Sequence, residues 1–310
     1  MTAANDAPAI SVEGLTKRFG DRTVVDDLAL TVPRGAIYGF LGPNGSGKTT
    51  TIRMVCGLLK PDAGRGTALG FDVLTESDRI KERTGYMTQK FSLYEDLSLR
   101  ENLEFIARLY RLEDVNAGVD GALDKLGLSE RAAQLAGSLS GGWKQRLALA
   151  ACMIHAPDLL LLDEPTAGVD PKARRDFWDE IRRYAREGVT TLISTHYMDE
   201  AVQCDSIAYI AYGKKLVDAP TGDIPGFLGL HAWRVRSNDL DAAEEVLRGA
   251  PGVELVARFG TELHVAGRDE AALAASVARL RGAGGSAEPM EAGLEEAFIH
   301  LMTLSADNYK

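Results

Sequence analysis

The feature that most constrains the fold of this chain is GPNGSGKTT, the glycine-rich segment Gly42–Thr50. The apolar run Ala36–Leu41 precedes it and predicts a buried strand, while Thr50–Leu59 follows it and predicts a helix. One face of that helix is expected to carry Ile52, Val55 and Leu59. A glycine-rich turn from strand to helix exposes successive backbone N–H groups at the positive end of the helix dipole. The segment therefore predicts a phosphate-binding loop.

The pattern G-x-x-x-x-G-K-[ST] assigns chemistry to single residues of this loop. Lys48 is long enough to reach the β- and γ-phosphates of a nucleotide, and the Thr49 hydroxyl can ligate Mg²⁺. The alternative is a glycine turn with an exposed lysine, which the flanking strand and helix disfavour. The residues expected to contact the nucleotide are Gly42, Pro43, Asn44, Gly45, Ser46, Gly47, Lys48, Thr49 and Thr50.

Polar residues follow three further predicted strands. Gln89 comes after the run GYMT, Asp163 and Glu164 come after the four leucines Leu159–Leu162, and His196 comes after VTTLIST. Four consecutive leucines are typical of a parallel strand that is covered on both faces. Because ligands bind at the carboxyl ends of the strands in open α/β sheets, these side chains are expected to converge on the phosphate site.

Phosphoryl-transfer chemistry gives these residues distinct roles, since it depends on positioning and charge stabilisation. Asp163 is expected to hold Mg²⁺, and Glu164 to orient and deprotonate the attacking water. His196 would contact the γ-phosphate, and Gln89 would lie near Mg²⁺ and the water. An acidic pair in a solvated turn and a structural histidine are the alternatives. The shared position of all four residues at strand ends favours the catalytic interpretation.

The segments around this core predict two smaller structural regions. Runs of alternating polarity on either side of Gly20-Asp21 predict an antiparallel hairpin. Phe19 beside that turn either faces the core or offers a stacking surface for adenine, and the sequence leaves the two equal. Residues 90–155 read as helices, so an all-helical insertion interrupts the α/β pattern.

The segment LSGGWKQR, Leu139–Arg146, decides which family the chain resembles. With the loop at Gly42, the acidic pair and the remaining motifs in this order, it resembles the signature of ATP-binding-cassette (ABC) ATPases over roughly residues 9–220. Phe19 then matches the aromatic loop, and Asp170 in AGVDP matches the D-loop. Ser140, Gly141 and Gly142 open a helix, and their amides would form a second anion site.

The resemblance implies how such a cassette works. In the family, the signature of one cassette meets the γ-phosphate of ATP held by a second cassette, and two cassettes close head-to-tail on two ATP–Mg²⁺. This chain carries one phosphate loop and one signature, so it is expected to form a homodimer or to pair with a similar chain. Phe19 in place of the commoner tyrosine and Trp143 within the signature depart from the family pattern without removing a catalytic group.

Two segments resemble the ATPase subunits of type-2 ABC exporters, namely Gly57–Val73 and Gly85–Phe105. The resemblance implies a motor subunit that drives a separate integral membrane permease, at the cytoplasmic face of the membrane, to export a drug, ion, lipid or similar cargo. The loop from Gln89 to about Leu103 would dock the permease. Phe91, Leu93 and Tyr94 are candidate anchors, and packing between the helical and α/β parts is an equally good role for them.

The C-terminal part predicts the order β-α-β-β-α-β followed by a helix, LEEAFIHLM, which resembles the closing segment of those exporter ATPases. This order suggests a small ferredoxin-like α+β domain, favoured as a stabilising or dimerising appendage over a ligand sensor. The expected fold is thus an α/β P-loop NTPase core with an antiparallel β subdomain and the helical insertion, plus this domain. The expected organisation is a flexible tail at 1–8, an ABC ATPase domain at 9–222 with its helical subdomain at 90–155, and an accessory domain at 225–310.

The net charge of the chain disfavours a function in nucleic-acid binding. The net charge is −10, which makes nonspecific nucleic-acid binding unfavourable, and no nucleic-acid partner is expected. The alternative is a soluble ABC ATPase that acts on ribosomes or DNA. The short interval between Gln89 and Leu139 has no room for the long coiled coil of chromosome-maintenance relatives, and a single cassette is unlike the translation-factor relatives.

Overall fold

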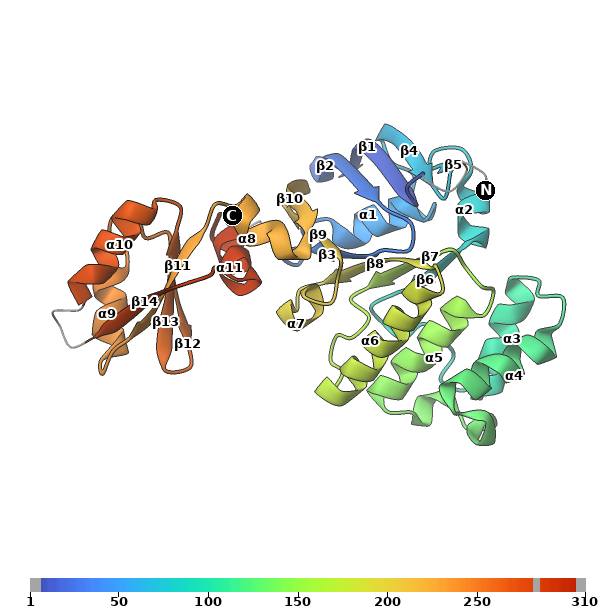
Figure 1. Cartoon of the computed structure of the whole chain (residues 1–310). Helices are drawn as coiled ribbons and strands as arrows, with labels where there is room; N and C mark the ends of the chain where they lie inside the picture. The colour runs from blue at the N-terminus through green and yellow to red at the C-terminus, as the bar shows by residue number, and fades with distance from the viewer. Residues whose placement is uncertain (1–6, 281–284, 305–310) are drawn as a thin grey trace. The chain divides into compact units, whose positions relative to one another are not determined.

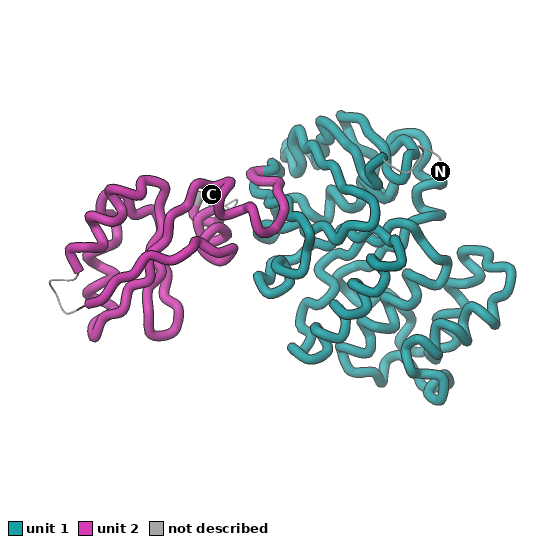
Figure 2. The backbone as a smooth tube through the Cα atoms, in the orientation of Figure 1, with its two compact units in different colours: residues 1–215 teal, residues 216–310 magenta. Residues whose placement is uncertain are grey.

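The computed structural model describes residues 7–280 and 285–304. Most of the predicted flexible tail, residues 1–6 of 1–8, lies outside the described residues. The chain divides into two compact units, residues 1–215 and 216–310 (Figure 2). The division falls a few residues before the linker at 222–225 that the sequence suggests.

The first unit begins with a four-stranded antiparallel sheet in the order β2-β1-β4-β5. The predicted hairpin around Gly20 is confirmed, because β1 and β2 pair directly on either side of it. The strands are β1 (Ile10–Phe19), β2 (Arg22–Val32), β4 (Ala63–Ala68) and β5 (Phe71–Asp72).

A second sheet of six strands runs in the order β10-β9-β3-β8-β7-β6. Neighbours from β9 through β6 pair in parallel, and the four leucines of β7 are fully buried, as predicted. The strands are β3 (Ile37–Leu41), β6 (Thr84–Met87), β7 (Leu159–Asp163), β8 (Thr190–Thr195), β9 (Ser206–Ala211) and β10 (Lys214–Pro220).

The helices of the α/β part are α1 (Lys48–Val55), α2 (Ser77–Glu82), α6 (Pro171–Arg186) and α7 (Met198–Ala201). The prediction that α1 extends to Leu59 is wrong. Gly57 has a φ of 72°, and its N–H donates to the carbonyl of Met54, so the helix ends at a left-handed glycine. In α6 the predicted stripe of Phe177, Ile181 and Tyr184 is buried.

The segment between β6 and β7 is helical, as predicted (Figure 1), and its side chains form a small core of their own. Its main helix, α3, begins with a capping box in which Ser98 and Glu101 each satisfy a backbone N–H of the other. α5 leaves this subdomain and packs beside α6. The helices are α3 (Leu99–Leu109), α4 (Val115–Leu126), η1 (Ser129–Arg131), η2 (Ala136–Ser138) and α5 (Gly141–Met153).

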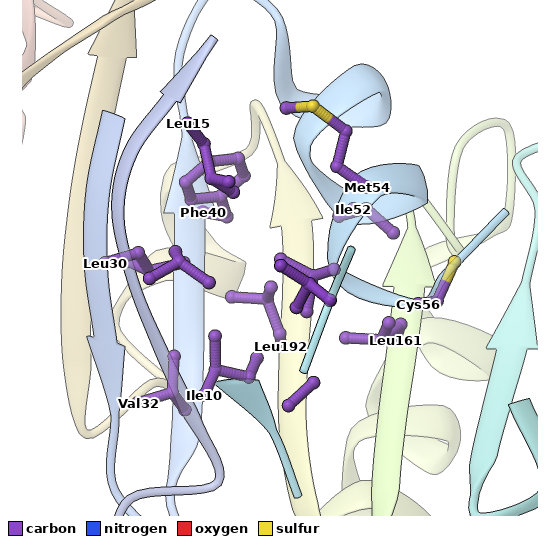
Figure 3. Close-up of a cluster of buried hydrophobic side chains, with 14 of the residues drawn as sticks. Ile10, Leu15, Leu30, Val32, Phe40, Ile52, Met54, Cys56, Leu161 and Leu192 are labelled. Carbon is purple, nitrogen blue, oxygen red and sulfur yellow. The ribbon is translucent and has the colours of Figure 1, made fainter. Parts of the chain in front are cut away.

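One large core of the first unit lies between its two sheets and α1 (Figure 3). Leu15 and Leu30 come from the antiparallel sheet, Phe40 and Leu192 from the parallel sheet, and Ile52 from α1, and all five side chains are at most 1% exposed. Removing one such side chain costs about 2–5 kcal/mol, so this core holds the strand–loop–helix around the glycine-rich segment in one place.

The second unit contains a four-stranded antiparallel sheet in the order β12-β13-β11-β14. The sheet elements follow one another as strand, helix, strand, strand, helix, strand. They are β11 (His231–Arg236), α9 (Leu240–Leu247), β12 (Leu255–Phe259), β13 (Glu262–Gly267), α10 (Glu270–Ala278) and β14 (Ser286–Met290). The unit also has η3 (Thr221–Asp223), α8 (Ile224–Phe227) and α11 (Leu294–Leu304), the last of which packs on α8 and β12. Across residues 7–280 and 285–304, no helix has the length and apolar character of a membrane span.

Candidate active site

The glycine-rich loop between β3 and α1 forms a cradle that requires glycine. Gly42, Gly45 and Gly47 have φ angles of 150°, 77° and 104°. A Cβ atom on Gly42 would lie 2.0 Å from the carbonyl oxygen of Ile210, and one on Gly47 would lie 2.7 Å from that of Val24. The loop is therefore pressed against β9 and β2, and side chains at these glycines would push it out of shape.

A cavity of about 300 Å³ opens over this loop. Because α1 begins at Lys48, the free N–H groups of its first turn are directed to this end of the helix. The site therefore suits an anion such as the triphosphate group of a nucleoside triphosphate. The lining residues are Val24, Asn44, Gly45, Gly47, Lys48, Thr49, Thr50, Gln89 and Glu164.

Lys48 is the cation of the cavity and is only 5% exposed. Its Nζ donates to the carbonyl oxygens of Gly42 at 2.8 Å and Pro43 at 3.1 Å, and lies 3.5 Å from Oε1 of Glu164. Burial lowers the pKa of Lys48, and the neighbouring carboxylate of Glu164 opposes that shift. The ammonium is thus held extended beneath the cavity, ready to pair with a phosphate.

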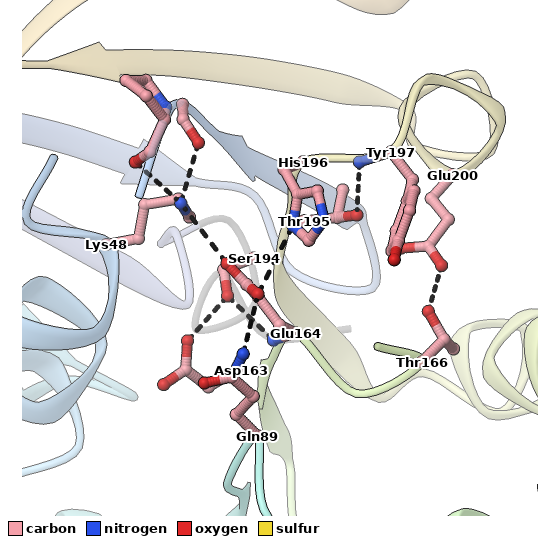
Figure 4. Close-up of polar contacts among 12 residues, drawn as sticks. Lys48, Gln89, Asp163, Glu164, Thr166, Ser194, Thr195, His196, Tyr197 and Glu200 are labelled. Atoms are coloured by element: carbon pink, nitrogen blue, oxygen red, sulfur yellow. Dashed lines mark hydrogen bonds and ion pairs between the residues drawn. The ribbon is translucent and has the colours of Figure 1, made fainter. Parts of the chain in front are cut away.

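Glu164 is the point at which the predicted catalytic residues meet (Figure 4). Besides Lys48, Nε2 of Gln89 donates to its Oε2 at 3.1 Å, and Nδ1 of His196 lies 3.4 Å from the same oxygen. The backbone of Glu164 has a φ of 47°, in the left-handed region that costs a non-glycine residue energy. Three segments far apart in the sequence therefore converge on one carboxylate whose backbone is strained.

Asp163 forms a second cluster next to Glu164, with two hydroxyl groups. Its Oδ1 accepts hydrogen bonds from Oγ1 of Thr49 at 3.0 Å and from Oγ of Ser194 at 2.8 Å. A carboxylate beside a threonine hydroxyl matches the oxygen ligands that Mg²⁺ prefers, so these residues fit the predicted ion. Ser194 is a site residue that the sequence analysis missed, and its place in a strand of apolar and hydroxyl residues contains no signal that could have found it.

Phe19 does not belong to the core. Its side chain is 52% exposed at the end of β1, and Nζ of Lys17 lies 5.7 Å from the centre of its ring. The exposure excludes the core-facing alternative for this residue. An exposed aromatic ring remains available to stack on a planar base.

The signature residues are placed at the start of α5. Ser140 is the N-cap, Gly141 has no atoms within 4 Å of an added Cβ, and a Cβ on Gly142 would lie 2.5 Å from the Cβ of Ala173 in α6. The close packing of α5 on α6 therefore requires glycine at position 142, independently of the predicted contact with an anion. None of these three residues lines the cavity over the glycine-rich loop.

Asp170 caps the N-terminus of α6. Its carboxylate accepts hydrogen bonds from the backbone N–H groups of Lys172 at 3.1 Å and Ala173 at 3.0 Å. Like the signature, it is not part of the cavity lining. The structure thus brings together Lys48, Thr49, Gln89, Asp163, Glu164 and His196, and places the signature and Asp170 outside that cavity.

The three candidate docking residues of the helical subdomain behave differently. Phe91 and Leu93 are partly buried against the helical core, whereas Tyr94 is 51% exposed. The Tyr94 ring meets the exposed ring of Phe105 edge-on, with centroids 5.5 Å apart. Packing accounts for Phe91 and Leu93, and the exposed aromatic pair Tyr94–Phe105 is the feature that packing does not explain.

Comparison with known proteins identifies the family. The family model described as ABC transporter matches residues 25–167. The daunorubicin/doxorubicin resistance ATP-binding protein DrrA of Streptomyces peucetius is 39% identical over 259 residues, which cover 83% of this chain and 77% of that protein. The chain belongs to the ABC transporter family.

Other members of the ABC transporter family show the same likeness. The Nod factor export ATP-binding protein I of Ralstonia nicotianae is 38% identical, and the match covers 87% of this chain and 85% of that protein. The probable multidrug ABC transporter ATP-binding protein YbhF of Escherichia coli is 43% identical over 217 residues, and this chain spans 38% of its length. This chain therefore contains the ATPase domain that the family's ATP-binding subunits share.

Solved ABC cassettes share this fold. One, determined in its ADP conformation, matches with a TM-score of 0.62 at 25% identity, over 69% of this chain and 91% of that chain. An ATP-binding subunit of an ABC transporter matches with a TM-score of 0.65 at 26% identity, over 71% of this chain and 93% of that chain. The predicted mixed α/β cassette is thus confirmed.

Proposed function

We propose that this chain is the ATP-hydrolysing motor subunit of an ABC exporter. The observation that carries the proposal is the convergence of Lys48, Gln89 and His196 on Glu164 beside a glycine cradle that fits phosphates. A nucleotide-gated switch without turnover has no need for a carboxylate held at that point. ATP is the substrate, and the energy of its hydrolysis would be used by a separate membrane subunit.

The residues of the cluster divide the chemistry among them. The loop amides from Gly42 to Thr50 and the ammonium of Lys48 bind and orient the phosphates. Thr49 and Asp163, with Gln89 nearby, would hold Mg²⁺, which neutralises charge on the phosphate oxygens when bound. Glu164 orients the water and accepts its proton.

His196 and Phe19 would complete the site around the nucleotide. His196 donates to the γ-phosphate, and the ring of Phe19 stacks on adenine. The exposed position of Phe19 and the 3.4 Å approach of His196 to Glu164 support these assignments. Both groups act by positioning, which is the main source of rate enhancement in phosphoryl transfer.

A second copy of the cassette would complete each site. Ser140, Gly141 and Gly142 sit at a helix start that lies outside the chain's own cavity, together with Asp170. Their amides suit an anion, so two cassettes closing head-to-tail would place each signature over the ATP of the partner. The chain would then form a homodimer, or a pair with a similar cassette.

The dimer is tested by light scattering on the Glu164→Gln chain with and without ATP. ATP is expected to convert the variant from monomer to dimer, because binding is retained while hydrolysis stalls. Adding Gly141→Asp should abolish the dimer without unfolding the monomer, since a Cβ there meets no atom within 4 Å but its charge repels phosphate. An ATP-dependent dimer that forms equally well with Gly141→Asp would contradict the head-to-tail assignment.

The membrane partner would be an integral permease of the type-2 exporter class, with this chain bound at the cytoplasmic face. The names of DrrA and of the Nod factor export protein support export, of a drug, ion, lipid or similar cargo. Tyr94 lies a few residues beyond Gln89, and its exposed ring contacts the exposed ring of Phe105 in α3. A permease helix docked on this pair would therefore be linked to the nucleotide site.

Docking is tested by affinity capture of the Glu164→Gln chain from detergent-solubilised host membranes. A stoichiometric polytopic membrane protein is expected, and Tyr94→Asp should reduce its recovery about tenfold. Val246→Asp, on the exposed face of α9, is the matched control and should leave recovery unchanged. Recovery with ribosomal or DNA-maintenance proteins alone would favour the soluble alternative.

The domain plan belongs to the same proposal. We place an ABC ATPase domain at 9–222, with a helical subdomain at about 90–155, and an accessory domain of ferredoxin-like βαββαβ type at 225–310. The antiparallel order β12-β13-β11-β14 supports that assignment. The accessory domain is proposed as a stabilising or dimerising appendage.

A further inference from the structure

Glu200 in α7 is a buried acid outside the cavity over the glycine-rich loop. It is 1% exposed, and burial raises its pKa, while a hydrogen bond from Thr166 and the charge of Arg174 oppose that rise. The hydroxyl of Thr166, itself buried, donates to its Oε1 (Figure 4). A carboxylate removed from water at this cost is kept only where its partners hold it firmly.

Arg174 supplies the second partner from the first turn of α6. Its Nε lies 3.5 Å from Oε1 of Glu200, and its Nη1 lies 2.9 Å from Oδ2 of Asp199. The guanidinium carbon also lies 4.3 Å from the centre of the Tyr197 ring, which in turn contacts the ring of His196 at 4.2 Å. Arg174 thus joins α6 directly to Tyr197, Asp199 and Glu200, and reaches His196 through the Tyr197 ring.

Thr166 connects the same cluster to the catalytic carboxylate. It lies two residues after Glu164 in a compact turn, where the N–H of Ala167 donates to the Glu164 carbonyl at 3.2 Å and that of Val169 to the Thr166 carbonyl at 3.1 Å. The turn ends at Asp170, the N-cap of α6. A displacement of the turn therefore moves Glu164 at one end and Asp170 at the other.

We propose that Thr166, Glu200 and Arg174 are positioning residues that lock the turn between Glu164 and Asp170 to the loop that carries His196. The proposal rests on the roles assigned above to Glu164, His196 and Asp170. Because these contacts connect the two segments, a movement of either one shifts the other. When His196 binds the γ-phosphate, the contacts also fix the position of the turn that bears Asp170. None of the three residues lines the nucleotide cavity, so we expect their loss to lower turnover much more than nucleotide affinity.

The experiment measures steady-state ATPase and ATP affinity for single substitutions in the full chain. Thr166→Val keeps the side-chain shape and removes the hydroxyl, and it should lower kcat about tenfold while the Kd for ATP stays within about twofold, because small misplacements of catalytic groups cost large factors in rate. Glu200→Ala should do the same, and Glu200→Gln, which still accepts the Thr166 hydrogen bond, should stay within about threefold of wild type. Arg175→Ala, an exposed arginine next to Arg174, is the control and should leave kcat unchanged.

A double variant separates positioning from general destabilisation. If the lock acts through His196, the Thr166→Val and His196→Ala pair should be no more than about twofold slower than His196→Ala alone. Wild-type kcat in Thr166→Val, or multiplicative losses in the double variant, would overturn the proposal even if Glu200→Ala fails to fold. Wild-type kcat in His196→Ala would overturn the role of His196 itself, and the lock with it.

Discussion

Two buried carboxylates, one in each unit, have very different surroundings. Glu164 in the cassette has Lys48, Gln89 and His196 around it and lines a cavity. Glu296 on α11 accepts the N–H of Gly293 at 2.7 Å through Oε2, and its Oε1 lies 2.6 Å from Nδ1 of His264 on β13. Each is almost fully enclosed by protein.

The two carboxylates differ in what surrounds them and in whether they face a cavity. Glu296 uses each of its carboxylate oxygens on a neighbour within the second unit, so its charge fastens α11 to the sheet. Glu164 is approached by three polar side chains from other segments, and it faces space beside a glycine cradle. A buried carboxylate by itself therefore indicates only a structural role. A buried carboxylate that faces a cavity beside a phosphate-binding loop is a candidate catalytic residue.

The largest expected effect concerns phosphate binding by Lys48 in the cassette. Lys48→Ala should weaken ATP–Mg²⁺ binding about 1000-fold, because two charge-assisted bonds to phosphate are together worth about 4 kcal/mol. Isothermal titration calorimetry measures the change. Lys81→Ala, on the exposed surface of α2, is the control, and equal affinity in the two variants would contradict the phosphate-loop assignment.

A smaller effect tests the second unit. Glu296→Ala should destabilise that unit by about 3 kcal/mol, because it leaves His264 without its buried partner, and should leave ATP affinity unchanged. Hydrogen exchange of the β13 amides reports the local opening. Glu295→Ala, at the neighbouring exposed position, is the control. A loss of ATP affinity in Glu296→Ala would contradict a purely structural role for Glu296.

The smallest effect concerns Phe19. Phe19→Ala should weaken ATP binding by about 1 kcal/mol, or about fivefold, because it removes a stacking surface of the size measured for aromatic pairs. Phe19→Tyr should retain wild-type affinity. Calorimetric titration with ATP compares the two variants, and equal loss in both would show that the ring does not stack on the base.

Most of the cassette could be predicted because its signals are local. The four leucines of β7 could be read as a covered parallel strand, and the glycines at 42, 45 and 47 as a loop of special conformation, since periodicity and residue type alone carry that information. The strand-end rule then placed Gln89, Asp163 and His196 near one another without any knowledge of side-chain contacts.

The remaining features depend on tertiary contacts that a sequence does not display. Ser194 meets Asp163 only because β8 and β7 pair in one register, and Glu200 is buried only because α7 packs on the turn at Thr166. The helix α1 ends earlier than the apolar pattern predicts, because Gly57 adopts a left-handed conformation inside an apolar run that continues to Leu59. The helical spacing of apolar residues continues to Leu59, beyond the glycine at which the helix stops.

The role of Glu164 as catalytic base is tested by measuring both the steady-state ATPase rate and the ATP affinity of Glu164→Gln. We expect kcat to fall at least 100-fold while the Kd for ATP stays within a few-fold of wild type, because the amide keeps the shape of the carboxylate but cannot accept the proton of water. Wild-type turnover in Glu164→Gln would contradict the claim that the end of β7 supplies the catalytic base.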